Sequence, residues 1–364
     1  MRPVLSIVMP ARNDNYMGNS NWRLETALDF LAIELDKLNK LKDVEVIIVD
    51  WGSKVPLHTV LTLNEKADSI ARFILVSDSV INTIKIDSDF PAVIAANVGI
   101  RRAWGNFIAL SPADILFTRR FFKRLFDILH GESDVGAPAD KSLFVFSRKD
   151  IPTHITDQNL SISDLSKYIA ENDKKILPIS LHPYYLTPAS VLMMHRNLWF
   201  ASHAFDENLI HWGWSDIDLC LRMRLRHFIT DMSKEDVMCL YHLNHYTQGF
   251  TRTKMSYPSI NPFVVNNKRW GLADYTLEEV SKVPKTVDLD ISSMPVDITY
   301  ETSDANKYFR VRHLVNLIEF FLKNANIGNL KLVFSHSAII LFQYPFMKKI
   351  FPLLKRIKRS PVQQ

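Results

Sequence analysis

Acidic and aromatic residues crowd into one short stretch of the sequence, Trp-Gly-Trp-Ser-Asp-Ile-Asp, which is followed by an apolar helical pattern. An acid that opens a helix lies at the positive end of the helix dipole, and apolar neighbours raise the basicity of a carboxylate. Asp216 is therefore a candidate general base, and Asp218 beside it could orient the group that loses its proton. The platform on which a sugar ring could stack consists of Trp212, Gly213 and Trp214. A second interpretation stays open, in which Asp216 only caps the helix and the tryptophans belong to the core.

A single acid follows one of the predicted strands. Asp114 comes shortly after the apolar run Asn106–Leu110, so we expect it at the carboxyl edge of a sheet. A carboxylate there could bind Mg²⁺ or Mn²⁺, which take hard oxygen ligands and could neutralise a diphosphate. Alternatively, Asp114 caps a helix that begins near Thr118.

Two histidines lie at the end of the strand-like run Val237–Tyr246. His242 and His245 both come after Asp216 in the chain, and either imidazole could complete the coordination shell of a metal bound to Asp114. The alternative is that this histidine pair only packs in an aromatic segment or faces solvent. Because all three groups of residues occur in one chain, we favour a shared site.

Short β-rich runs alternate with amphipathic helical patterns in the segment 1–130. The expected strands cover Leu5–Met9, Val44–Val49, Arg72–Val76 and Asn106–Leu110. The expected helices cover Trp22–Asn39, Leu57–Ala67, Ala92–Trp104 and Arg119–Leu129. This order predicts an α/β fold with a mostly parallel sheet and helices on both of its faces.

Ligands of such folds bind beyond the carboxyl ends of the strands. In this chain polar loops follow three of the expected strands, at Pro10–Asp14, Asp50–Ser53 and Ser111–Asp114. We therefore expect a nucleotide to bind along this edge of the sheet.

Composition excludes several classes of protein. The chain has 364 residues, of which 47% are hydrophobic and 23% charged, as in ordinary globular proteins. Two cysteines, Cys220 and Cys239, are too few for a secreted disulfide framework, which favours a reducing, cytoplasmic compartment. The N-terminal sequence does not read as a signal peptide, and no apolar run reaches the roughly 18 residues of a membrane span.

Positive charge is concentrated at the C-terminus. The segment 320–364 contains eight Lys or Arg and no acid, so subtracting these eight charges from the total of +5 leaves −3 for the segment 1–319. The mildly acidic main body makes nucleic-acid binding a minor alternative. In the tail, basic and apolar residues are mixed. We expect either peripheral contact with the cytoplasmic face of an anionic membrane or a helix packed on the main domain.

The sequence predicts two parts. We expect a catalytic α/β domain over residues 1–275, in which 1–130 form the nucleotide-binding half and 185–250 the acceptor and metal half. Residues 276–364 are expected to form a helical extension with the basic tail. The polar segment 150–185 reads as an insertion or lid outside the core.

These motifs resemble a known family, the nucleotide-sugar glycosyltransferases of the GT-A fold, over about residues 4–250. Trp-Gly-Trp-Ser-Asp-Ile-Asp is similar to the WGWG-G-E-D-D-D signature of galactosyltransferase-type members, and the family-2-like enzymes are similar in their opening strand, here Leu5–Asn13. The helix that contains Asn97–Arg101 resembles the N-x-G-I helix packed under the diphosphate. The donor-binding residues that the resemblance implies are Pro10, Arg12, Asn13, Asp50, Gly52, Asn97, Arg101 and Asp114.

The resemblance implies an inverting hexosyltransferase that moves a sugar from a nucleotide-diphosphate donor to a saccharide or lipid-linked acceptor, in surface polysaccharide or glycan synthesis. Asp216 would be the base, and Asp114 with one of the two histidines would bind Mn²⁺ or Mg²⁺. Two positions depart from the family. Pro112 replaces the first acid of its D-x-D metal motif, and Ser215 replaces the usual Glu before the catalytic Asp. The alternative is a non-catalytic nucleotide-sugar or carbohydrate-binding protein of the same fold.

Overall fold

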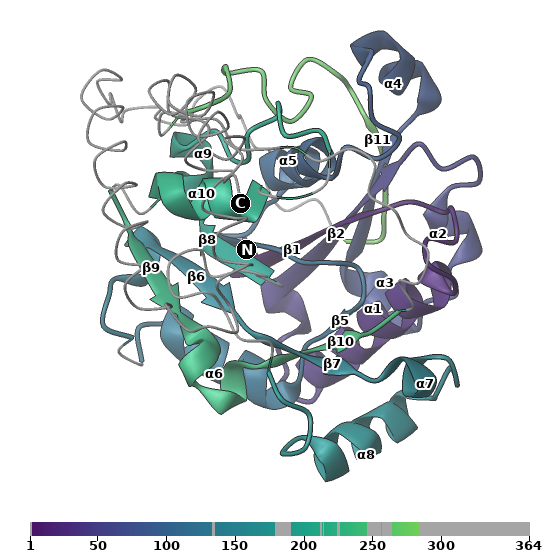
Figure 1. Ribbon diagram of the computed structural model, residues 1–364, viewed down its shortest axis with the longest axis vertical. Helices are drawn as coiled ribbons and strands as arrows, with labels where there is room; N and C mark the ends of the chain where they lie inside the picture. The colour runs from purple at the N-terminus through teal and green to yellow at the C-terminus, as the bar shows by residue number, and fades with distance from the viewer. Residues whose placement is uncertain are drawn as a thin grey trace, which may run out of the picture. The chain divides into compact units, whose positions relative to one another are not determined.

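An eight-stranded sheet forms the centre of the computed structural model (Figure 1). The structure describes residues 2–132, 135–178, 191–211, 213, 215–223, 226–245, 256 and 264–283. The strand order is β11-β3-β2-β1-β4-β8-β6-β9. These strands are β1 (Leu5–Ala11), β2 (Val44–Trp51), β3 (Ala71–Val76), β4 (Phe107–Leu110), β6 (Ser142–Phe146), β8 (Val191–His195), β9 (Phe228–Asp231) and β11 (Glu278–Ser281).

The α/β fold predicted from the sequence is confirmed. Strands β3, β2, β1 and β4 are parallel neighbours, as the alternating pattern of the segment 1–130 predicts. Antiparallel pairing enters beyond them, where β8 pairs with β4 and β6, and where β11 pairs with β3. The sheet is therefore mixed: its four N-terminal strands are parallel neighbours, and a second parallel pair, β6 and β9, lies at the other edge.

Helices cover both faces of the parallel strands (Figure 1). The helices within the described residues are α1 (Ser20–Asp36), α2 (Leu57–Val60), α3 (Glu65–Ile70), α4 (Asp78–Ile84), α5 (Ala92–Arg102), α6 (Arg119–Leu129), α7 (Thr153–Thr156), α8 (Ile162–Asn172), α9 (Arg196–Ala201) and α10 (Ser215–Met223). Helices α1 and α6 share one hydrophobic core with alternate residues of β1, and α5 contacts β1 and β2.

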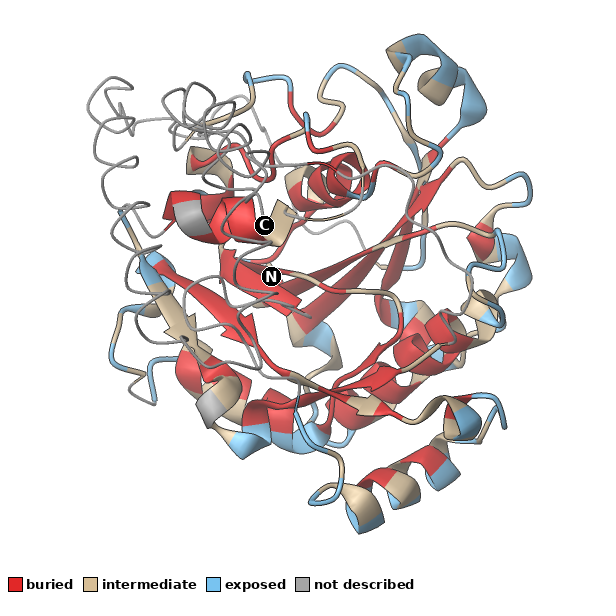
Figure 2. Ribbon diagram, viewed as in Figure 1, coloured by how far each residue is buried: buried red, intermediate tan, exposed pale blue. Residues whose placement is uncertain are grey.

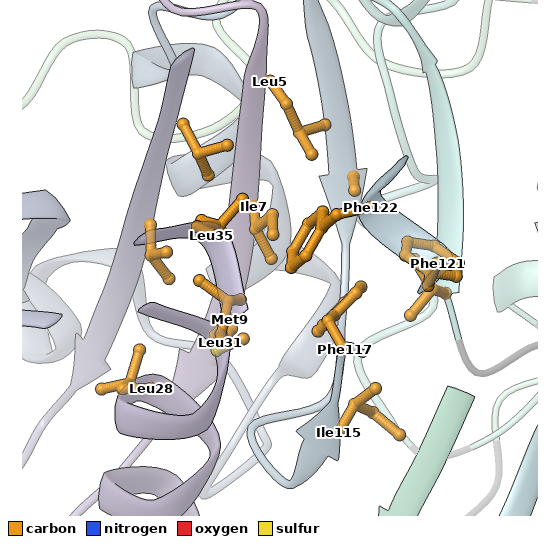
Figure 3. Close-up of a cluster of buried hydrophobic side chains, with 14 of the residues drawn as sticks. Leu5, Ile7, Met9, Leu28, Leu31, Leu35, Ile115, Phe117, Phe121 and Phe122 are labelled. Carbon is orange, nitrogen blue, oxygen red and sulfur yellow. The ribbon is translucent and has the colours of Figure 1, made fainter. Parts of the chain in front are cut away.

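The core between β1 and the two long helices has the periodicity that the sequence predicts. Leu5, Ile7 and Met9 alternate along β1 and face the leucines of α1 and the phenylalanines around α6 (Figure 3). Leu28 and Leu31 are almost fully buried in this core. Most residues of β1, β2 and β3 are buried (Figure 2), because helices pack on both faces of these strands.

On the opposite face, a glycine lets α5 lie close to the sheet. A Cβ at Gly99 would overlap Cγ1 of Val8 and would come within 2.9 Å of Cγ2 of Val49. Real side chains do not approach so closely, so a larger residue would push α5 away from β1 and β2. This close packing fixes α5, which contains Asn97 and Arg101, two of the predicted donor-binding residues.

A second sheet of three strands carries residues from distant parts of the chain. Its order is β5-β10-β7, with β5 at Ile115–Leu116, β10 at Leu240–Leu243 and β7 at Arg148–Ile151. Leu165 and Ile169 of α8 pack against the hydrophobic side of this sheet.

The expectation that residues 150–185 are irregular is wrong for the described part of that segment, which contains the end of β7, α7 and α8; that the segment forms an insertion or lid stays a prediction. The end of α8 is fixed to the small sheet and to α6 by Asp173, whose carboxylate pairs with Lys149 at 2.5 Å and with Arg120 at 2.8 Å. Asp150 and Asp173 of this segment pair with charged groups, and Leu165 and Ile169 are buried.

Three further elements differ from the sequence-based expectations. The single helix expected over Leu57–Ala67 is two short helices, α2 and α3, and helix α4 was not expected. Strand β11 lies beyond residue 275 but forms an edge of the large sheet, so the α/β domain continues past the predicted boundary. Most of the predicted extension, including the basic tail, lies outside the described residues.

None of the helices in the described part of the chain is long and apolar enough to cross a bilayer.

A buried ion pair joins β2 to β3. The Arg72 guanidinium lies 2.5 Å from the Glu45 carboxylate, and both side chains are almost inaccessible to solvent. Glu45 also accepts hydrogen bonds from Ser6 and from the backbone N–H of Trp104, so its charge is well compensated. Arg72 in turn pairs with Glu279 of β11 at 2.9 Å.

We predict that Glu45→Gln destabilises the protein by about 3 kcal/mol, because it leaves the Arg72 charge buried with only a half-exposed partner. Urea unfolding at neutral pH measures this. Asp36→Asn is the matched control, since it breaks a solvent-exposed pair with Lys66 and should change stability by less than about 1 kcal/mol. Equal effects of the two substitutions would contradict the stabilising role of the buried pair.

Candidate metal centre

Strand pairing brings together three of the site residues predicted from the sequence. Asp114 immediately precedes β5, and β10 pairs antiparallel with β5 so that His242 lies opposite Ile115. The backbone N–H of Leu243 donates to the carbonyl of Asp114 at 3.0 Å. His245 follows shortly after β10 ends. The structure therefore places the side chains at positions 114, 242 and 245 close together.

The three side chains form a compact group. Nε2 of His242 lies 3.5 Å from Oδ1 of Asp114, and Nε2 of His245 lies 3.7 Å from Oδ2 of the same carboxylate. One ligand atom from each residue can be chosen so that all three lie within 4.8 Å of one another. All three side chains are largely buried, with exposures of 6% for His242, 13% for Asp114 and 16% for His245.

This donor set fits a divalent cation. One carboxylate oxygen and two imidazole nitrogens can all reach a single ion at ordinary ligand distances of about 2.0–2.3 Å, which leaves positions for water or a ligand oxygen. Mg²⁺ takes oxygen ligands almost exclusively, so two imidazoles favour a transition metal such as Mn²⁺. Whether the group binds Mn²⁺ or Mg²⁺ stays a prediction.

The charges in this group are mutually dependent. Burial would raise the pKa of Asp114, but the hydrogen bond and charge of His242, together with His245 and Arg23, lower it. Burial would lower the pKa of His242, but the two carboxylates that it contacts, Asp114 and Asp150, raise it. Burial lowers the pKa of His245. Asp114 is thus held as an anion by neighbouring positive charge.

Arg23 is a member of the site that sequence reasoning missed. Its Nε lies 3.5 Å from Oδ2 of Asp114, and the side chain is 4% exposed. The guanidinium also donates to the carbonyls of Gly18 and of Tyr16, the latter at 2.8 Å. A signal for it exists in the sequence, because a cation in the first turn of a helix opposes the helix dipole and so needs an anionic partner.

Arg23 also fixes the loop that follows β1. Asn15, Met17 and Asn19 all have left-handed backbone conformations, which non-glycine residues adopt at a cost. The loop brings the ring of Tyr16 edge-on to His245, with ring centroids 5.7 Å apart. Tyr16 is 43% exposed, so it presents an aromatic surface beside the candidate metal centre.

Residues proposed to contact a nucleotide form a network between β1 and β2. Asp50 is buried, and its carboxylate accepts hydrogen bonds from Ser53 and from the backbone N–H of Leu57. Ser53 also accepts from the backbone N–H of Asn13 at 2.8 Å. Gly52 has φ of +64° and its N–H donates to Val76, so it supplies the left-handed turn after β2. Asp50 therefore holds the two loops together in this structure.

The other predicted donor residues also make internal contacts. Asn97 is buried and both donates to and accepts from the backbone of Phe205, while Arg101 lies over the ring of Trp270. Arg12 pairs with Asp14 at 2.6 Å. Pro10 is partly accessible near the end of β1. The buried residues Asp50 and Asn97 could reach a ligand only after rearrangement. The partly accessible donor-binding candidates are Pro10, Arg12, Asn13, Gly52 and Arg101.

The predicted acidic pair separates into two environments. Asp216 lies in the first turn of α10 and accepts a hydrogen bond from the backbone N–H of Ile217 at 3.0 Å. Asp218 is 2% exposed and pairs with the buried Arg222 at 2.8 Å, and Arg222 also donates to the carbonyl of Ala204. This pair anchors α10, so the expectation that Asp218 orients an acceptor does not fit its burial.

The remaining predicted residues have different outcomes. Asp216 is not a member of the Asp114 group. Gly213 lies in a bend before α10, whereas Trp212 and Trp214 lie outside the described residues. The alternative that Asp114 caps the next helix is wrong, because Thr118 caps α6 by accepting from Phe121.

Comparisons with known proteins give matches among solved structures alone. No protein-family model matches the chain, and no curated protein does. The crystal structure of S. aureus TarS 1-349 is similar at 16% identity with a TM-score of 0.44, over 66% of this chain and 60% of that one. TarS 1-349 in complex with UDP-GlcNAc is similar at 14% identity with a TM-score of 0.42, over 71% of this chain and 62% of that one. The chain thus covers less than two thirds of these structures.

We predict that Mn²⁺ binds more tightly as the pH rises from about 6 to about 8, because a cation on Nε2 of His242 must displace a proton held by a raised pKa. Isothermal titration at several pH values measures this. His242→Ala should weaken binding more than about tenfold, whereas the exposed His154→Ala should leave it unchanged. Affinity that is insensitive to pH and to His242→Ala would exclude this residue as a ligand.

Proposed function

We propose that the protein is a glycosyltransferase that uses a nucleotide-diphosphate sugar as donor. The observation that carries this proposal is the group of Asp114, His242 and His245 just beyond the carboxyl end of β4. In α/β sheets this edge is where nucleotides bind. A cation-binding group there suits a ligand that carries a diphosphate.

The residues of the centre have separate tasks in this proposal. Asp114, His242 and His245 would hold a divalent cation, which neutralises negative charge on a diphosphate leaving group. Arg23 compensates the Asp114 carboxylate and fixes the loop that contains Tyr16. That loop and the Asp50–Ser53–Asn13 network form the wall on the β1–β2 side, where the nucleoside would bind.

We assign the acceptor side to the start of α10. Asp216 would accept the proton of the acceptor hydroxyl as that oxygen attacks the anomeric carbon from the face opposite to the diphosphate. One such displacement inverts the anomeric centre, and a positioned base contributes on the order of 10²- to 10⁴-fold to the rate. The acceptor would be a saccharide or a lipid-linked saccharide in polysaccharide or glycan synthesis.

A second candidate is a nucleotide-sugar-binding or carbohydrate-binding protein without transferase activity. Two observations favour it: Pro112 occupies the position of the first acid of the metal motif, and Asp216 is hydrogen-bonded to its own helix. Both candidates bind the donor, but only the first breaks its bond to the sugar.

We predict that the purified chain releases UDP from UDP-GlcNAc, or from another donor in a panel of UDP-, GDP- and dTDP-sugars, and that Asp216→Asn lowers turnover at least about 100-fold with little change in donor affinity. Asp164→Asn is the matched control, since Asp164 is also a first-turn helix acid but is exposed on α8. A panel in which donors bind but none is consumed supports the second candidate. Transfer that survives Asp216→Asn would remove this residue from the role of base.

The basic tail leads us to propose peripheral contact with an anionic membrane, which would give access to a lipid-linked acceptor. The segment 348–359 contains six Lys or Arg among apolar side chains, and each basic residue near such a surface contributes about 1 kcal/mol. We predict that the full chain floats with anionic vesicles at low salt, less at high salt, and not with neutral vesicles. No flotation with anionic vesicles at either salt concentration would exclude this contact.

A further inference from the structure

A carboxylate that lies outside the group of three contacts the other side of His242. Oδ1 of Asp150 lies 2.9 Å from Nδ1 of the imidazole, while Nε2 of the same ring faces Asp114 at 3.5 Å. The contact follows from strand register, because β7 and β10 pair in parallel with His242 directly opposite Asp150. Side chains at paired positions extend on the same face of a sheet, so the fold itself places this acid behind the histidine.

The chemistry of this contact fixes which nitrogen carries a proton. An ionised carboxylate can only accept hydrogen bonds, so Nδ1 of His242 must donate. The Asp150 carboxylate contacts both the Arg148 guanidinium and the His242 imidazole, and the positive charge of Arg148 favours its ionised form. When Nδ1 carries the proton, Nε2 presents its lone pair toward Asp114 and any cation bound there.

The surroundings leave the imidazole little freedom. The His242 side chain is 6% exposed, and Arg148 holds the same Asp150 oxygen at 3.0 Å. The first acid expected of a D-x-D motif is absent at Pro112, so Asp114 is the one carboxylate of the group. Asp150 supplies a second negative charge that acts on a cation through the imidazole rather than by direct contact.

We propose that Asp150 is a positioning residue, which holds His242 in the Nδ1-protonated tautomer with Nε2 directed at a divalent cation. This inference rests on the metal centre of the proposed function, but not on sugar transfer.

The first test measures Mn²⁺ binding to the full chain without any donor. Asp150→Ala should weaken binding about 10- to 100-fold. Asp150→Asn should weaken it less, because the amide oxygen still accepts a hydrogen bond from Nδ1. The matched control is Asp157→Asn, which removes an equal charge from an exposed position at the end of α7 and should leave the affinity unchanged. Urea unfolding of each variant checks that the fold is retained.

The second test reads the tautomer directly. In the metal-free chain labelled with ¹⁵N-histidine, at a pH at which the ring is neutral, long-range ¹H–¹⁵N correlation should show the proton of His242 on Nδ1. In Asp150→Ala this protonated Nδ1 signal should be lost or exchange-broadened, a change that a purely structural role would not produce. An unchanged signal, or a folded Asp150→Ala variant with wild-type Mn²⁺ affinity, would overturn the inference.

These outcomes separate the inference from the proposed function. Graded loss of Mn²⁺ affinity in the order Asp150→Asn, Asp150→Ala supports the role of Asp150 even if no donor is consumed. Sugar transfer by a variant whose metal affinity is unchanged would retain the function and reject the positioning role.

Discussion

The pairing of β10 with β5 on one side and with β7 on the other is the constraint on which the candidate site depends. These three short strands come from distant parts of the chain. Their register places His242 between Asp114 and Asp150. Without that register, the buried imidazole of His242 would lose both of its carboxylate partners, and Asp114 would keep Arg23 alone of the charged groups that now surround it. The small sheet therefore determines both the geometry and the electrostatics of the site.

The site contains both acidic and basic residues because each buried charge needs a partner of opposite charge. Asp114 is surrounded by two imidazoles and the Arg23 guanidinium, and Asp150 is paired with Arg148. Compensation of this kind lets the chain keep ionised groups in a partly buried position. A cation would enter a site in which His242 is already oriented by its contact with Asp150, so little ordering of this side chain is needed on binding.

The sequence predicted the elements with strong periodicity and missed those that depend on long-range contacts. The strands of the parallel sheet, the leucine stripe of α1 and the phenylalanine face of α6 follow from local patterns. The meeting of Asp114 with His242 and His245 was inferred from residue types and resemblance. Arg23 and Asp150 were missed, because a cation in the first turn of a helix indicates only that some anion lies nearby, and an acid in a strand indicates no partner at all; the partners lie far away in the sequence. For a related reason, the sequence alone does not show whether Asp218 forms a buried ion pair with Arg222, as in the structure, or lies in a cleft open to a substrate.

The most direct test of the account is anomalous diffraction from crystals of the full chain grown with Mn²⁺ and UDP. The account predicts one strong manganese peak within coordination distance of Asp114, His242 and His245, with oxygens of the diphosphate bound to the same ion. Density for UDP at the carboxyl edge of β1 and β2 should accompany it. A manganese peak elsewhere, or UDP bound away from these three side chains, would contradict the central claim that they form the centre at which a nucleotide diphosphate is held.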